Sequence, residues 1–294
     1  MTQDRSDAWP VLRTQAQLGE GPVWCGRRNR LFWTDILGQS FSQFDPTTGQ
    51  NTTITLDDPL CAFALMADGR FLCAFAHCIA IMDATGGREP ALYRLTGEDP
   101  ANRFNDGKCD ARGRFWIGTM NTQGKRGLGA LYRFDPDGTL HRMWDGLSTS
   151  NGLGWSPDGH VFYLTDSPTG QIHAFDFDPD QGRISRQRCF ARIPADIGRP
   201  DGLCVDTRGY VWSAIWDGAR VLRFAPDGTI DREIHLPVPR PTSVAFGGPG
   251  LTRLYVTSCR GGLDAATLER HPLSGSLFAL DPGVQGRPEP LAAF

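Results

Sequence analysis

Four side chains with carboxylate or amide oxygens stand in similar local surroundings at distant points of the chain: Glu20, Asn105, Asn151 and Asp201, each followed within two positions by glycine. Converging carboxylates repel one another unless a cation neutralises them, and cations are commonly held where Asp, Glu and Asn oxygens meet without histidine or thiolate. The pattern therefore predicts a site for one divalent metal cation. Hard oxygen ligands permit Ca²⁺, Mg²⁺ and Mn²⁺ and do not exclude Zn²⁺ or Fe²⁺.

A plainer interpretation is that Asn-Gly and Asp-Gly are turn residues, because these pairs are common in turns. For any one of them alone the turn is favoured. Four at matching positions of four repeats favour a site, all the more since Glu20 is not a usual turn residue. Asp106, in the run Asn-Asp-Gly, fits a turn at least as well as an outer ligand and stays outside the set.

The elements that must position these residues repeat along the chain. A short apolar and aromatic strand recurs at intervals of roughly 40 to 50 residues, which is typical of propeller blades. Glycine turns precede most copies and another alternating strand follows most of them, which makes hairpins. Four antiparallel strands in each of six units predict an all-β, six-bladed β-propeller, with residues 1–294 as a single domain. The aromatic strands are 31–36, 70–75, 114–119, 161–166, 210–215 and 253–258.

The polar residues lie roughly nine to eleven positions before the aromatic strand of their unit, where each innermost strand is expected to begin. The first strand of every blade lines the central channel, so equivalent positions form a ring around one mouth of it. The second unit has the apolar pair Leu60 and Cys61 at this position, and the last unit has Thr242 and Ser243. Two carboxylates and two amides are therefore expected to converge.

Two further features concern the ends of the repeat. Residues 11–16 precede the first inner strand, and we expect them to complete the last blade near residues 290–294. Residues 262–270 show neither strand alternation nor the length of a tight turn, and Asp264 is expected to be the N-cap of a short helical turn there.

Composition excludes several classes of function. The formal net charge is -3 and the basic residues are scattered, so no nucleic-acid partner is expected. The chain has no apolar run of membrane-spanning length and begins with a polar segment, which predicts no membrane partner and a cytoplasmic protein. The 8 cysteines include no C-x-x-C pair and are expected to be reduced core thiols. The histidines lack zinc-site spacing, and G-x-S-x-G before a helix is absent.

At these residues the chain resembles the gluconolactonase/regucalcin (senescence marker protein) family over nearly its full length. The resemblance is specific because several motifs occur in order. They are Leu-Gly-Glu-Gly-Pro-Val-Trp at 18–24, Asn-Arg-Phe-Asn-Asp-Gly-Lys at 102–108, Gly-Thr-Met at 118–120, Ser-Asn-Gly-Leu at 150–153, Arg-Pro-Asp-Gly at 199–202 and Gly-Leu-Asp at 262–264.

The resemblance implies a role for each matching residue. Glu20, Asn151 and Asp201 match the positions that coordinate the divalent metal, and Asp201 also matches the proposed general base. Arg103 and Asn105 match positions that contact the carbonyl and hydroxyl groups of the substrate. One position departs from the pattern, because Gln123 stands near where some relatives carry a sugar-binding glutamate, so the resemblance does not specify the substrate.

The function expected from this resemblance is metal-dependent hydrolysis of a sugar lactone, such as gluconolactone, arabinonolactone or xylonolactone, to the free acid. Either Asp201 or a water activated by the cation starts the attack, and the sequence does not separate the two. The alternative is a non-catalytic, calcium-binding regulatory propeller, which would use the same ligands but would not need Arg103 or Asn105 near the metal. A propeller that serves only as an interaction platform fits less well, because the aromatic residues repeat at core positions.

Overall fold

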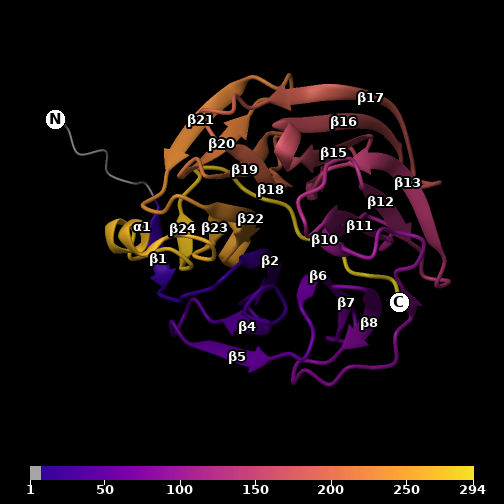
Figure 1. The fold of residues 1–294 in the computed structure, drawn as a ribbon, viewed down its shortest axis with the longest axis horizontal. Coiled ribbons are helices and arrows are strands. Elements are labelled where there is room, and N and C mark those ends of the chain that lie inside the picture. The colour runs from indigo at the N-terminus through magenta and orange to yellow at the C-terminus, as the bar shows by residue number, and fades with distance from the viewer. Residues whose placement is uncertain (1–7) are drawn as a thin grey trace.

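Six four-stranded antiparallel sheets stand around a central axis in the computed structural model, which describes residues 8–294 (Figure 1). Five sheets are consecutive meanders whose first strand lies nearest the axis. We number the sheets as blades one to six in chain order. The expected six-bladed β-propeller with four antiparallel strands per blade is confirmed.

The strands of the first three blades begin and end as follows. Blade one has β2 (Gly19–Cys25), β3 (Arg30–Asp35), β4 (Ser40–Phe44) and β5 (Asn51–Thr55); blade two has β6 (Leu60–Leu65), β7 (Phe71–Phe75), β8 (Cys78–Met82) and β9 (Tyr93–Arg94); blade three has β10 (Asn102–Cys109), β11 (Phe115–Asn121), β12 (Gly129–Phe134) and β13 (Leu140–Leu147).

The last three blades follow the same plan. Blade four has β14 (Ser150–Trp155), β15 (Val161–Asp166), β16 (Gln171–Asp178) and β17 (Arg183–Arg192), with the 3₁₀ turn η1 (Ser167–Thr169); blade five has β18 (Arg199–Val205), β19 (Val211–Trp216), β20 (Arg220–Phe224) and β21 (Ile230–His235); blade six has β22 (Pro241–Gly247), β23 (Arg253–Ser258), β24 (Leu277–Leu280) and β1 (Trp9–Leu12), with η2 (Pro249–Leu251) and the helix α1 (Ala265–Arg270).

The second strand of each blade carries the aromatic run seen in the sequence, and its side chains form the core between neighbouring blades. Trp116 and Trp212 are fully buried at equivalent places in blades three and five. The hydrophobic clusters extend from one blade to the next, so each sheet packs against a neighbour on both of its faces. Strands buried on both faces have continuous apolar runs in the sequence instead of an apolar–polar alternation. This packing fixes where each innermost strand begins, and with it the mouth of the channel.

The ring is closed by the N-terminal segment, although not in the way the sequence suggested. The strand β1 comprises Trp9–Leu12 and pairs antiparallel with β24, so it supplies the outermost strand of blade six. The expected closure against residues 290–294 is wrong. Those residues lie at blades two and three, where Ala292 bridges Met66 and the Ala293 N–H donates to the carbonyl of Gly113. Hydrogen bonds of this kind leave no periodic signal in a sequence.

The C-terminal tail, residues 285–294, crosses the far ends of the innermost strands (Figure 1). Arg287 Nη1 donates to the carbonyls of Trp155 and Ser156, at the end of β14. Glu289 lies 3.2 Å from Lys108, at the end of β10. The tail therefore covers the end of the channel opposite the one at which the innermost strands begin.

Three smaller expectations can be compared with the fold. The Asp264 side chain accepts a hydrogen bond from the Thr267 N–H at 2.7 Å, so it is the N-cap of α1 as predicted. All eight thiols lie in the described residues and are free, but Cys189 is exposed and is not a core thiol. None of the helices among residues 8–294 has the length and apolarity needed to cross a membrane.

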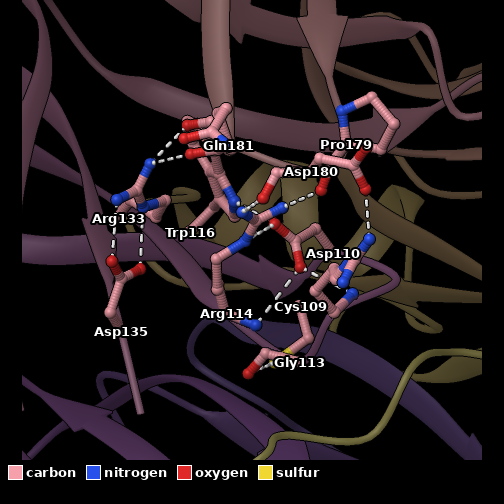
Figure 2. A network of polar contacts seen from close by, with 12 residues as sticks. Cys109, Asp110, Gly113, Arg114, Trp116, Arg133, Asp135, Pro179, Asp180 and Gln181 are labelled. Atoms are coloured by element: carbon pink, nitrogen blue, oxygen red, sulfur yellow. Dashed lines mark hydrogen bonds and ion pairs between the residues drawn. The ribbon is translucent and has the colours of Figure 1, made fainter. Parts of the chain in front are cut away.

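A buried ion pair between Asp110 and Arg114 lies in blade three, and its arginine also contacts blade four (Figure 2). Asp110 Oδ2 accepts hydrogen bonds from Arg114 Nε at 2.6 Å and from Trp116 Nε1 at 2.9 Å. Arg114 then donates to the carbonyls of Pro179 and Asp180 in the turn between β16 and β17. The side chains of Asp110 and Arg114 are only 1% and 10% exposed, so the pair is shielded from water and salt.

We expect Asp110→Asn to lower the free energy of unfolding by about 2 kcal/mol, because it leaves a buried guanidinium without its carboxylate. Urea unfolding at constant m-value measures the loss. The control is Asp68→Asn, which breaks an exposed pair with Arg70 in the turn between β6 and β7 of blade two, where the two side chains are 47% and 38% exposed. We expect the Asp68→Asn substitution to lower the free energy of unfolding by less than about 1 kcal/mol. Equal losses in the two variants would contradict the assignment of a buried, stabilising pair to Asp110.

Candidate functional site

A cavity of about 250 Å³ opens at the end of the channel where the innermost strands begin. All five side chains singled out in the sequence line it: Glu20 from β2, Arg103 and Asn105 from β10, Asn151 from β14 and Asp201 from β18. Its volume suits a ligand of monosaccharide size rather than a larger one. Blades one, three, four and five thus bring the predicted residues together.

The two other blades contribute none of these polar groups. Leu60 and Cys61 are buried apolar residues in β6, as their types suggest. Thr242 in β22 is buried and donates to the carbonyl of Gly19, so it joins blade six to blade one instead of facing the cavity. The ring is therefore incomplete, with ligand-type residues on four of the six blades.

The backbone at the site explains the local sequence. Each polar residue lies inside an innermost strand and not in a turn, so the turn interpretation of Asn-Gly and Asp-Gly is wrong here. In these strands the pairing shifts register beside the polar residue, and such a bulge re-aims side chains. The shifts fall between Glu20 and Val23, Phe104 and Gly107, Asn151 and Leu153, and Pro200 and Leu203.

The deepest oxygens of the cavity lack protein partners. Asn151 Oδ1 and Asp201 Oδ1 are buried and accept no hydrogen bond from any described residue. Among those residues, the Glu20 carboxylate accepts only from the N–H of Gly21, at 3.2 Å. Buried polar atoms are nearly always satisfied, so oxygens left open together in one cavity are placed to coordinate a cation or to bind a ligand. The residues therefore fit a hard cation held by Glu20, Asn151 and Asp201.

The electrostatics of the site also favour a bound cation. Burial raises the pKa of the Glu20 carboxyl well above its ordinary value, and the negative charges of Asp201 and Asp106 raise it further. Burial also raises the pKa of Asp201 well above its ordinary value, with Asp106 adding to the effect. Asp106, which sequence reasoning set aside, has its pKa raised by burial to about 6. Three ionised carboxylates so close together are costly unless a cation offsets them.

This donor set differs from a site made of acidic, histidine or cysteine side chains alone. Among residues 8–294, no group of three or more His, Cys, Asp or Glu is arranged to hold a metal ion. The candidate site instead combines two carboxylates with an amide oxygen, as the sequence pattern predicts, and its remaining ligand positions would be open to water or substrate.

Arg103 and Asn105 form a unit on β10. Arg103 Nη1 donates to Asn105 Oδ1 at 2.8 Å and to the Phe104 carbonyl at 2.7 Å, while Asn105 Nδ2 donates to the Ser150 carbonyl at 2.9 Å. Both ends of the Asn105 amide are engaged, so this side chain ties Arg103 to blade four. Arg103 has no carboxylate partner within ion-pair distance in the described chain, which leaves its positive charge available to a ligand.

Other residues at the cavity were not found from the sequence. Met120, Trp216 and Arg199 line it, whereas Gln123 is exposed and does not. Arg199 precedes Asp201 by two residues, as Arg103 precedes Asn105. The period of two along a strand could therefore have identified it.

Cavities of about 90 and 320 Å³ lie at the tail end of the channel, between residues 285–294 and the blades. Glu289 lines both of them, and it already pairs with Lys108, which lines the smaller cavity. Unlike the mouth cavity, neither is lined by a buried carboxylate or amide oxygen without a partner in residues 8–294. The mouth cavity is therefore the strongest candidate for the functional site.

Comparison with known proteins gives consistent matches. Residues 18–260 match the family profile described as the SMP-30/Gluconolactonase/LRE-like region. A 6-deoxy-6-sulfogluconolactonase of Pseudomonas putida is 41% identical over 285 residues, which cover 96% of this chain and 97% of the relative. The structure of a calcium-binding regucalcin of Agrobacterium tumefaciens has a TM-score of 0.92 at 29% identity and covers 97% of both chains. A Xanthomonas campestris gluconolactonase structure has a TM-score of 0.74 at 26% identity, covering 93% of this chain and 89% of that one.

Proposed function

Because the chain belongs to the SMP-30/gluconolactonase/LRE-like family, we propose that it is a metal-dependent hydrolase that opens the ring of a sugar lactone to give the free acid. The observation that carries the proposal is the group of partnerless buried oxygens of Asn151 and Asp201, which line one cavity with Glu20. A hydrolase of esters needs to stabilise negative charge at a carbonyl oxygen and to activate water, and this cavity offers groups for both tasks.

Glu20, Asn151 and Asp201 would hold the cation in the mouth of the channel. When bound, the cation would supply Lewis-acid stabilisation of the negative charge that develops on the lactone carbonyl oxygen. Arg103 would donate a charge-assisted hydrogen bond to the same end of the substrate, since its guanidinium has no carboxylate partner in the described chain. Asn105 would hold Arg103 in place through the contact at 2.8 Å.

Asp201 is the proposed proton acceptor. Its Oδ1 atom is buried in the cavity and has no hydrogen-bond partner in the described chain, so this oxygen is open to accept a proton from a water molecule. A proton would pass from the attacking water to Asp201 as the water oxygen bonds to the carbonyl carbon. The same proton would then go to the ring oxygen as the acyl carbon–oxygen bond breaks.

The substrates that follow are aldonolactones, among them gluconolactone, arabinonolactone and xylonolactone. The name of the Pseudomonas putida relative adds a gluconolactone with a sulfonate at carbon 6 to the candidates. The cavity of about 250 Å³ suits a single sugar ring.

The test is acid release from glucono-, arabinono-, xylono- and galactonolactone, corrected for uncatalysed opening. We expect treatment with a chelator to lower turnover about tenfold or more, and Ca²⁺, Mg²⁺, Mn²⁺ or Zn²⁺ to restore it, because the cation stabilises the developing charge. Turnover that is indifferent to the chelator would contradict the metal, and the absence of turnover with every metal and lactone would contradict the hydrolase.

A calcium-binding, non-catalytic protein is the second candidate, favoured by the description of the Agrobacterium tumefaciens relative. It would bind the cation through the same three side chains. Calcium titration by calorimetry together with the lactone assay separates the two candidates, because binding without turnover on any lactone supports the second alone.

A further inference from the structure

The mouth cavity has two levels of side chains along the innermost strands. The deep residues are only 4–8% exposed, whereas the residues two positions earlier in the chain are half-buried or exposed. In β10 and β18 the two residues share a strand, where side chains two apart point to the same face, and in blades one and four the earlier residue directly precedes the innermost strand. The earlier residues form a rim above the deep ones. The rim residues are Leu18, Arg103, Thr149 and Arg199, above Glu20, Asn105, Asn151 and Asp201 respectively, and all eight line the cavity. The floor is acidic and the rim carries two arginines.

Arg199, on the blade-five side of the rim, carries positive charge that is only partly compensated. Its Nη2 atom donates to Asp217 Oδ2 at 2.6 Å, while Arg240 Nε donates to the other carboxylate oxygen of Asp217 at 2.6 Å. One carboxylate therefore serves two guanidinium groups, which leaves a surplus of one positive charge. Arg240 also lies over the ring of Trp216, 4.8 Å from its centroid, and Trp216 lines the cavity.

Arg199 is also accessible to a ligand. Its side chain is 48% exposed, and among the described residues it donates only through Nη2, so Nε and Nη1 remain free. A guanidinium presents a planar fork that fits the oxygens of sulfonate, phosphate or carboxylate. Arg199 is thus suited to hold an anionic group.

The charge balance of the loaded cavity favours such a group. A divalent cation would offset the charges of Glu20 and Asp201, and Asp106 places a third negative charge beside them on the blade-three side, toward Arg103. The part of the rim formed by Arg199 and Arg240, which share the single carboxylate of Asp217, would keep its surplus positive charge. A neutral sugar lactone would leave this charge unmatched, whereas a lactone with an anionic group on the carbon chain beyond the ring would pair with it.

We propose that the substrate is a sugar lactone bearing an anionic group at the end of the molecule away from the ring carbonyl, and that Arg199 pairs with that group. This inference rests on the proposed function, because it uses the same cavity and places Arg103 at the carbonyl. Arg199 is then a residue that determines specificity, while Glu20, Asn151 and Asp201 serve every lactone alike.

The experiment compares kcat/KM for glucono-1,5-lactone with that for the same lactone carrying a sulfonate or a phosphate at carbon 6. The wild type should prefer the anionic lactones. Arg199→Gln should lower the ratio of anionic to neutral kcat/KM about tenfold, mainly by raising KM for the anionic lactone. Arg199→Lys should recover part of the preference, and added salt should raise KM for the anionic lactones alone because it screens a half-exposed charge.

The ratio of anionic to neutral kcat/KM separates substrate recognition from a general effect on the site. Arg199 also lowers the pKa of Asp201, and a change in that pKa would affect the turnover of both substrates equally. The control is Arg188→Gln, which removes an arginine paired with Asp176 in blade four, away from the cavity. A wild type that hydrolyses neutral and anionic lactones equally well, or an Arg199→Gln ratio equal to that of Arg188→Gln, would overturn the inference and leave the hydrolase standing. No turnover of any lactone would instead overturn the proposed function itself.

Discussion

Asp201→Asn is expected to lower kcat/KM for a sugar lactone by about 10³-fold or more and, at the same time, to raise the melting temperature of the chelator-treated protein. The first effect follows because the variant loses a proton acceptor and an anionic cation ligand together, and general bases alone contribute about 10²- to 10⁴-fold. Steady-state kinetics with saturating metal measure it. The proposal predicts that extra metal does not restore the rate, since asparagine cannot accept the proton.

The second effect follows from the surroundings of the carboxylate in the metal-free protein. Asp201 is 4% exposed, its Oδ1 atom has no partner in residues 8–294, and Asp106 and Glu20 place further negative charge nearby. The neutral isostere removes this repulsion and the desolvation cost. Calorimetry with and without chelator measures the change.

The control for Asp201→Asn is Asp176→Asn, which removes a 41% exposed carboxylate from a surface pair with Arg188. It should leave both activity and melting temperature nearly unchanged. An Asp201→Asn protein that keeps its activity within a few-fold, or that melts below the wild type in chelator, would contradict the role given to Asp201.

Repetition made most of the fold predictable from the sequence. The six aromatic strands appear at β3, β7, β11, β15, β19 and β23, each within a residue or two of its expected bounds. The parts that were missed do not repeat. The pairing of β1 with β24 and the path of residues 285–294 depend on contacts between distant segments, and a single strand of four residues carries no signal of its partner.

The site was predictable to the extent that it follows the repeat. Aligning the units brought Glu20, Asn151 and Asp201 to one level, and they line one cavity. The register shifts beside them were not predictable, because a bulge and a turn use the same Asn-Gly and Asp-Gly pairs. Asp106 was set aside for that reason, yet its charge raises the pKa of both site carboxylates.

The glycines of these pairs also have a role that a turn would not give them, since they let adjacent innermost strands approach closely around the channel. A Cβ atom added to Gly152 in β14 would lie 2.4 Å from the backbone carbonyl oxygen of Asp201 in β18 and 2.7 Å from Thr165 Oγ1. The first of these atoms is main chain and cannot rotate away. Gly152 therefore sets the distance between the strand that carries Asn151 and the strand that carries Asp201.

We accordingly expect Gly152→Ala to lower kcat/KM by about 10²-fold and the free energy of unfolding by about 1 to 3 kcal/mol, although the new methyl group carries no charge. Relief of the contact requires β18 to move by about 1 Å, and a misplacement of that size is enough to separate Asp201 from Asn151 as joint ligands. Metal affinity should fall with activity in calorimetric titration. Gly26→Ala is the matched control, because a Cβ there meets nothing within 4 Å, and it should change stability by less than about 0.5 kcal/mol. A Gly152→Ala protein with wild-type metal affinity and activity would show that the spacing of β14 and β18 does not control the site.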